Sequence, residues 1–401
     1  MIGTDRRAVA VLAVAQALYL SAAAVVFTFS GLAGYMLAAD KALATLPVAL
    51  MTVATALATI PASLLMARVG RRRGFQLGAF FGAASGAVSA GAIMLGSFAL
   101  FCLGGALMGV FQGFAMYYRF AAADAADPSG KAKAVSWVLA GGVAAALIGP
   151  QVAAWSRSAL PTAEFAGSYL AVVALSFLSM VVLAGLRMPA PGPAERGGGR
   201  PLLVIARQPA FVVAVLNAAI AYGVMSFVMT ASPLAVVADG HGPDAAASVT
   251  RWHLLGMFVP SFVTGSLIAC FGVVRVLLAG AGLLLASAAT ALADPAALTH
   301  YHVALLLLGV GWNFLFIGGT TLLAETYQPA ERAKVQAANE FLVFGATALA
   351  TLAAGGVQTG FGWVAVNWSA VPAVMIAVGA TVWLAATALK RKPRPTPEKP
   401  S

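Results

Sequence analysis

The stretch DPSGKAK at residues 127–133 decides the fold, because a related stretch, QPAERAK, follows 201 residues later at residues 328–334. A second motif, L-x-A-x-x-G-x-x-R, occurs at residues 65–73 and again at residues 267–275. Two further pairs of polar residues repeat at the first offset: Gln112 with Asn313, and Asp124 with Glu325. A chain that repeats itself over half its length is predicted to consist of two similar halves.

The composition predicts that these halves lie in a membrane. Hydrophobic residues make up 61% of the 401 residues and charged residues only 9%, whereas soluble domains carry about 25% charged residues. The apolar runs are long and continuous, and the run from Ala8 to Ala39 contains no charged residue. Runs of this length are typical of membrane-spanning helices, not of the short alternating strands of a barrel. We therefore predict an all-α membrane protein.

Twelve transmembrane helices are predicted, and a break in composition separates them into two sets of six. We place them at residues 8–36, 43–66, 75–95, 97–120, 134–156, 165–186, 209–237, 248–270, 273–293, 303–324, 335–358 and 366–389. A Pro- and Gly-rich segment at 187–208 is unsuited to a spanning helix and is predicted to be a cytoplasmic linker. The predicted units are an N-terminal half at 1–186, this linker, a C-terminal half at 209–389 and a basic cytoplasmic tail at 390–401.

The distribution of charge predicts the orientation in the membrane. The net charge of +11 does not indicate a nucleic-acid partner, because the basic residues form short clusters between apolar runs. Loops on the cytoplasmic side of a membrane are enriched in Lys and Arg. Most of the 24 Lys and Arg residues lie before the first helix, in alternate loops and in the tail. Both termini are therefore predicted to be cytoplasmic, in a multi-pass protein that we expect to be a monomer in the lipid bilayer.

The loop after the second helix resembles a family signature. The sequence SLLMARVGRRR at residues 63–73 is similar to the Gly- and Arg-rich loop between helices 2 and 3 of major facilitators, although Ala67 replaces the usual Asp and Ser63 the usual Gly. This resemblance, with the six-helix repeat, implies a major facilitator fold and secondary transport by alternating access. The sequence contains no motif of a nucleotide-binding or hydrolytic enzyme.

The resemblance also implies a cytoplasmic gate made of charged residues at helix ends. Its candidate members are Arg68, Arg71, Arg72, Arg73, Arg119, Asp124, Arg275 and Glu325. The alternative is that the loop arginines only orient the helices in the membrane. For Arg119 three arrangements stay open: contact with lipid headgroups, pairing with Asp124, or pairing with Glu340. Because Glu340 lies inside a predicted helix, it is also the candidate site for a coupling proton.

Four residues of helices 7 and 8 suggest a metal. Met225 and Met229 lie four residues apart, as do His253 and Met257, so each pair shares one helix face. Thioether and imidazole groups are ligands of copper, and thioethers favour Cu(I). The alternative is that these methionines only fill gaps between helices. Gln112 and Asn313 are candidates either to line a central cavity or to join helices. Met51 is a further candidate for the cavity, as the residue of the first half that could assist the four of the second.

This four-residue pattern resembles the paired motif of the CcoA-like copper importers, which are bacterial major facilitators. The resemblance implies import of copper across the inner membrane for assembly of cbb3-type cytochrome c oxidase. Copper is then the transported substrate and not a cofactor, with a copper chaperone or acceptor as partner in the cytoplasm. Relatives on the same scaffold carry organic solutes, so the alternative is a carrier of a small organic solute such as riboflavin or a drug-like compound.

Overall fold

The computed structural model describes residues 5–40, 43, 46–157, 159–160, 163–188 and 199–390. Within these residues, twelve helical stretches are long and apolar enough to cross a membrane. This confirms the predicted all-α fold with twelve spanning helices. Residues 189–198 of the predicted linker and 391–401 of the predicted tail lie outside the described residues, and the predicted domain boundaries stay predictions.

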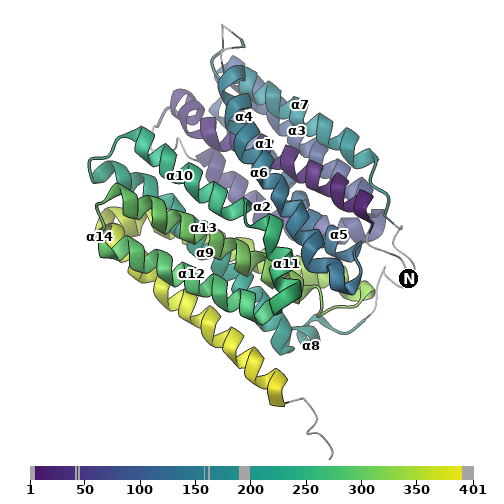
Figure 1. The fold of residues 1–401 in the computed structure, drawn as a ribbon. Coiled ribbons are helices and arrows are strands. Elements are labelled where there is room, and N and C mark those ends of the chain that lie inside the picture. The colour runs from purple at the N-terminus through teal and green to yellow at the C-terminus, as the bar shows by residue number, and fades with distance from the viewer. Residues whose placement is uncertain are drawn as a thin grey trace, which may run out of the picture.

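The helices form two groups that face each other (Figure 1). The first helix group comprises α1 (Arg6–Leu37), α2 (Leu46–Val69), α3 (Arg71–Leu95), α4 (Phe98–Ala115), α5 (Tyr118–Asp124), α6 (Lys131–Ser156) and α7 (Ala166–Ala184). After the short α8 (Leu202–Ala206), the second helix group comprises α9 (Pro209–Ala238), α10 (Pro243–Phe258), α11 (Ser261–Phe271), α12 (Val273–Ala293), α13 (Leu298–Leu323) and α14 (Arg332–Lys390). Contacts between the groups run mainly from α2 to α14 and from α6 to α11.

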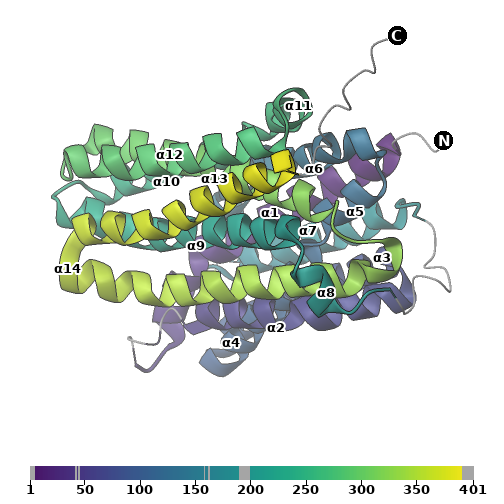
Figure 2. The same cartoon turned by 90° about the horizontal axis from the view of Figure 1, so that it is seen from below.

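The start of α1 and the end of α14 lie at the same end of the bundle, which we call the terminal end (Figure 2). Element α14 contains the last two spans, which are separated by a turn at Gly362 with φ of 78°. Such a positive φ favours glycine, which lacks a Cβ. The sequence predicted a gap at residues 359–365 between these two spans, but the structure is helical there except at this turn.

Two spans that the sequence predicted as continuous helices are broken. The span predicted at residues 97–120 divides into α4 and α5, and the span predicted at 248–270 divides into α10 and α11. At the second break, Pro260 has no N–H to donate to the preceding helical turn. The side chain of Asn313 binds polar groups on both sides of this break, since its Nδ2 donates to the carbonyl of Met257 and to Oγ of Ser261, both at 2.6 Å.

Glycines allow two equivalent pairs of spans to approach closely. A Cβ at Gly109 of α4 would lie 2.1 Å from the carbonyl oxygen of Met51 on α2. A Cβ at Gly309 of α13 would lie 2.5 Å from the carbonyl oxygen of His253 on α10. Small residues at such crossings are typical of helices that pack in a membrane. The crossings place the backbones of Met51 and His253 within helix–helix interfaces.

Candidate functional site

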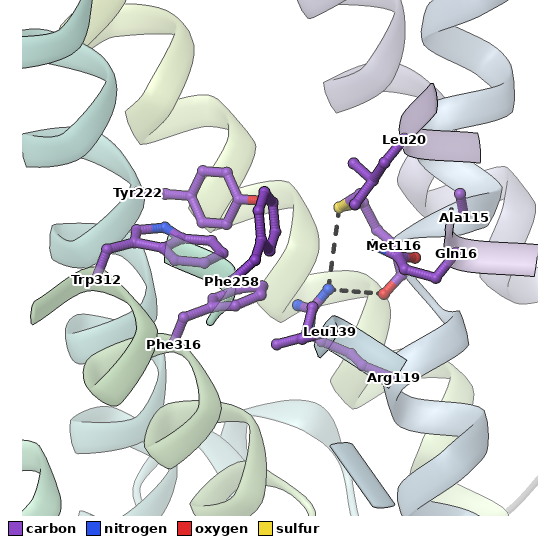
Figure 3. Close-up of a pocket in the computed structure, with 10 residues that line it drawn as sticks. All are labelled: Gln16, Leu20, Ala115, Met116, Arg119, Leu139, Tyr222, Phe258, Trp312 and Phe316. Atoms are coloured by element: carbon purple, nitrogen blue, oxygen red, sulfur yellow. Dashed lines mark hydrogen bonds between the residues drawn. The ribbon is translucent and has the colours of Figure 1, made fainter. Parts of the chain in front are cut away.

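A cavity of about 30 Å³, which we call the central cavity, lies between the two helix groups. Its walls differ in chemistry, as Figure 3 shows. The first helix group contributes Gln16, Leu20, Ala115, Met116, Arg119 and Leu139. The second contributes Tyr222, Phe258, Trp312 and Phe316, which we call the aromatic wall. The cavity therefore lies at the boundary between the groups, where relative movement of the groups will change its size.

The aromatic wall is a packed cluster of rings. Trp312 and Phe316 lie four residues apart on α13 and stack with their ring centroids 4.9 Å apart. The ring of Tyr222 packs edge-on against Trp312 at 5.2 Å. Phe258, the last residue of α10, meets Trp312 edge-on at 6.1 Å. Rings held in this way present a large, rigid apolar surface to the cavity.

Arg119, from the first helix group, packs against Phe316 of this wall and forms a buried ion pair with Glu340 of α14. Its Nη2 lies 2.5 Å from Oε1 of Glu340, and the two side chains are only 3% and 0% exposed. Its Nε donates to Oγ1 of Thr320 at 3.1 Å, and its Nη1 donates to the carbonyl of Met116 at 2.7 Å. Of the three arrangements that the sequence left open for Arg119, the structure shows pairing with Glu340. This ion pair joins the two helix groups.

The carboxylate of Glu340 is paired unequally. Its Oε1 also accepts a hydrogen bond from Nδ2 of Asn339 at 2.7 Å. Its Oε2 is buried and has no hydrogen-bond partner among the described residues. The guanidinium of Arg119 is further held between two rings, at 4.5 Å from the centroid of Phe120 and 4.2 Å from that of Phe316. Arg119 is therefore tightly positioned, while one oxygen of its partner stays available.

A second ionic cluster joins the groups at the terminal end. Asp124 pairs with Arg71 at 3.2 Å and with Arg332 of α14 at 3.0 Å. The hydroxyl of Tyr327 donates to Asp124 at 3.3 Å, and Nη2 of Arg71 donates to Oε1 of Gln336 at 2.5 Å. We call these five residues the terminal cluster. It borders a cavity of about 400 Å³.

The terminal cluster contains only part of the predicted gate. Arg71 and Asp124 belong to it, whereas Arg332 was not among the predicted members. The other predicted members at this end are exposed and lie outside the cluster: Arg68, Arg72, Arg73, Arg275 and Glu325. Asp124 therefore lies in an ionic cluster between the groups, whereas its repeat counterpart Glu325 is exposed.

The predicted metal set occupies helix–helix interfaces. Nδ1 of His253 donates to the carbonyl of Leu305 on α13 at 2.9 Å, so its ring faces α13. Phe258, five residues later on the same helix, lines the cavity, and five residues correspond to about 140° of rotation. Met225 and Met257 are buried and Met229 is half-buried, and none of the four lines the central cavity. Within the described residues, no group of three or more His, Cys, Asp or Glu side chains is placed to hold a metal.

The three residues predicted as candidates for a central cavity lie between helices, and two of them, Gln112 and Asn313, had the joining of helices as the alternative. Asn313 is fully buried and its Oδ1 accepts from Oγ1 of Thr264 at 2.6 Å. Oε1 of Gln112 accepts from Oγ1 of Thr55 at 3.2 Å, which links α4 to α2. Met51 is buried in the same α2–α4 interface. Of the two alternatives, the structure favours the joining of helices.

The aromatic wall is not predicted from the sequence. A signal was present in part, because Trp312 and Phe316 are spaced i, i+4 beside Asn313. Tyr222 and Phe258 lie on other helices, and no local spacing relates them to Trp312. Gln16, a polar residue in the first apolar run, was a further signal that was not used.

Comparison with known proteins identifies the family. The model of the Major Facilitator Superfamily matches residues 12–250 and 214–401. The chain is 43% identical over 374 residues to the riboflavin transporter RfnT of Brucella anthropi, which covers 92% of this chain and 94% of that protein. It is 28% identical over 332 residues to the uncharacterized MFS-type transporter YddS of Bacillus subtilis, covering 77% of this chain and 76% of the relative.

Solved structures with the same fold include transporters of several kinds. The human organic anion transporter MFSD10 superposes with a TM-score of 0.76 at 16% identity, over 94% of this chain and 99% of that chain. The fucose:proton symporter FucP of E. coli superposes with a TM-score of 0.72 at 16% identity, over 93% and 98%. At such identities the likeness shows the fold alone.

These comparisons support the predicted superfamily but not the copper importers within it. The relative that matches nearly the whole chain is named a riboflavin transporter. The findings therefore favour the organic-solute alternative over copper import, which was our main prediction. The chain belongs to the Major Facilitator Superfamily, and is a twelve-helix membrane transporter and not an enzyme.

Proposed function

We propose that this chain transports riboflavin, or a closely similar flavin, across a bacterial inner membrane by alternating access. The observation that carries the proposal is the 43% identity to the riboflavin transporter RfnT, which extends over 92% of this chain. Because the match is nearly full-length, it includes both helix groups that form the central cavity. In this proposal both termini are cytoplasmic, as the basic loops indicate.

The chemistry of the central cavity supports a planar organic solute. Riboflavin carries a flat three-ring system, and the aromatic wall offers it surfaces for stacking. The opposite wall offers the guanidinium of Arg119 and the amide of Gln16 as hydrogen-bonding groups. Among the lining side chains, Met116 alone carries a soft metal ligand, and its sulfur already lies 4.0 Å from Nη1 of Arg119. This arrangement suits a flavin ring better than a copper ion.

The size of the cavity requires movement of the helix groups. A water molecule needs at least about 10–15 Å³ of such volume, so 30 Å³ admits water but not a flavin. Since the aromatic wall and Arg119 belong to different groups, separation of the groups widens the cavity between them. We propose that the terminal cluster is the gate that closes the cytoplasmic end in this cycle. Glu340 stays the candidate site for a coupling proton.

Uptake in whole cells tests the proposal. The chain is expressed in a bacterium that requires riboflavin and lacks its own riboflavin carrier, and radiolabelled riboflavin and total cellular copper are measured in the same cultures. We expect saturable riboflavin uptake above that of cells with an empty vector, with unchanged copper content. Excess unlabelled riboflavin is expected to suppress the labelled uptake, whereas excess fucose is not. Copper accumulation without riboflavin uptake would favour the copper importer instead.

A further inference from the structure

The ion pair between Arg119 and Glu340 is joined through one oxygen only. Oε1 of Glu340 accepts from both Nη2 of Arg119 and Nδ2 of Asn339, whereas Oε2 is buried without a partner. A buried carboxylate oxygen without a donor is unfavourable and calls for an explanation. A bidentate pair would have used both oxygens. The structure therefore leaves one acceptor unused on Glu340, which pairs with the cavity-lining Arg119 but does not itself line the cavity.

The guanidinium of Arg119 leaves a donor unused at the same place. Arg has five N–H groups, and Nε, Nη1 and Nη2 each make one hydrogen bond to an oxygen: to Thr320, Met116 and Glu340. One N–H of Nη2 therefore stays available on the nitrogen that binds Glu340. Arg119 is among the residues that line the cavity. The ion pair thus holds one unused donor on Arg119 and one unused acceptor on Glu340.

We infer that Arg119 and Glu340 together bind the imide edge of the flavin ring through hydrogen bonds. This inference rests on the proposed function. The edge carries carbonyl oxygens on both sides of one N–H, at ring position 3. The free N–H of Arg119 donates to a ring carbonyl, and Oε2 of Glu340 accepts from the ring N3–H. The aromatic wall stacks against the faces of the same ring.

The position of the two residues links recognition to closure. Arg119 belongs to the first helix group and Glu340 to the second, so the pair exists only while the groups are together at this depth. The groups must first separate to admit the ring, because the cavity of 30 Å³ is too small for it. A ring that then binds both residues favours closure of the groups around it, because it gains both hydrogen bonds only when the groups are close. The contacts of Arg119 with Thr320, Met116 and the two rings hold the guanidinium in place before the ring arrives. Arg119 and Glu340 are thus proposed as specificity residues of the carrier.

Two ligands distinguish this inference from the proposed function itself. The purified full-length protein is titrated with riboflavin and with 3-methylriboflavin, in which the N3–H is replaced by a methyl group, and flavin fluorescence reports binding. We expect the wild type to bind the methylated ligand at least about tenfold more weakly, as loss of a hydrogen bond to a charged group implies. Equal affinities would overturn the inference and leave riboflavin transport standing. Absence of riboflavin binding and uptake by the wild type would overturn both.

A variant assigns the effect to Glu340. Glu340→Gln keeps the size of the side chain but places an NH₂ group where a carboxylate oxygen stood. We expect it to bind riboflavin about tenfold more weakly and to lose most of the discrimination against 3-methylriboflavin, as in a double-mutant cycle. Glu164→Gln, in the exposed ion pair with Arg157, is the matched control and should keep full discrimination. If Glu340→Gln folds and discriminates as the wild type does, the assignment to Glu340 is wrong; if it does not fold, the comparison of the two ligands on the wild type decides.

Discussion

The two helix groups are joined by ionic contacts at two depths, and these contacts are built differently. The central pair consists of one guanidinium and one carboxylate, Arg119 and Glu340, with exposures of 3% and 0%. The terminal cluster shares one carboxylate, Asp124, between two arginines that are 10% and 24% exposed. A hydroxyl and an amide add further hydrogen bonds there. Among the described residues, each charge of the central pair has one charged partner. In the terminal cluster, by contrast, one carboxylate pairs with two arginines.

Burial also determines how much each ionic contact contributes to folding stability. A charge that loses its partner in a dry interior is strongly unfavourable, while a partly exposed charge regains water. The central pair therefore resists separation, and one of its members, Arg119, lines the cavity. The terminal cluster is suited to open and close. Substitutions in the central pair are therefore expected to have larger effects than substitutions in the terminal cluster.

Removal of one central partner is expected to have the largest effect. Glu340→Ala leaves the guanidinium of Arg119 buried without a counter-charge, which costs about 3–5 kcal/mol of folding stability. The expected result is a strongly lowered melting temperature of the purified protein and loss of riboflavin uptake. Tryptophan fluorescence during heating measures the first, and radiolabelled uptake the second.

A double substitution separates the two consequences. Arg119→Met with Glu340→Met removes both charges and fills similar volume, which is often neutral for stability. We expect it to restore the melting temperature but not the uptake. Glu164→Ala provides the comparison at the surface, since its exposed pair with Arg157 is worth only about 0–1 kcal/mol. Equal melting temperatures for Glu340→Ala and Glu164→Ala would show that the central pair is not the critical contact.

Weakening of the terminal cluster is expected to have an intermediate effect. Asp124→Asn keeps the shape of the side chain but removes the charge shared by Arg71 and Arg332. Closure of the terminal end then becomes less favourable. A tenfold shift of the equilibrium from the closed to the open terminal end corresponds to about 1.4 kcal/mol. We expect the initial rate of riboflavin uptake to fall by about that factor, with little change in melting temperature.

Salt and a distant carboxylate serve as controls for this prediction. Partly exposed charges are screened by ions, so uptake by the wild type should fall with rising salt more than uptake by Asp124→Asn. Asp294→Asn, at an exposed site beyond the end of α12, should transport as the wild type does. If Asp124→Asn takes up riboflavin at the wild-type rate, the terminal cluster is not the gate.

The sequence predicted the membrane architecture well because that architecture depends on long apolar runs. Such runs specify where a helix crosses, since every backbone group must be paired in lipid. They do not specify where a helix breaks. Pro260 was a visible signal for the α10–α11 break, whereas no proline marks the α4–α5 break at Met116 and Tyr117. The sequence also leaves the ion-pair partner of Arg119 undecided, because Glu340 lies on another helix and only tertiary packing brings the two side chains together.

The candidate site shows the same limit more clearly. The i, i+4 spacing of His253 and Met257 fixes a shared helix face but not the neighbour that this face meets. In the structure His253 meets α13, through the carbonyl of Leu305. Trp312 and Tyr222, 90 residues apart, meet in the aromatic wall without any local pattern that relates them. A pattern within one helix therefore predicts which residues lie together, while the substrate site is formed between helices.

The smallest effect is expected outside both ionic contacts, at Met225. This residue is 9% exposed on α9, and it lies three residues after Tyr222 but does not line the cavity. Met225→Leu conserves volume, and such exchanges usually cost less than about 1.5 kcal/mol. We expect riboflavin uptake within about twofold of the wild type and an unchanged cellular copper content. Met375→Leu, at an exposed site on α14, is the matched control. Because a leucine cannot ligate copper, a selective fall in copper content for Met225→Leu would restore the Met and His residues of α9 and α10 as a metal site.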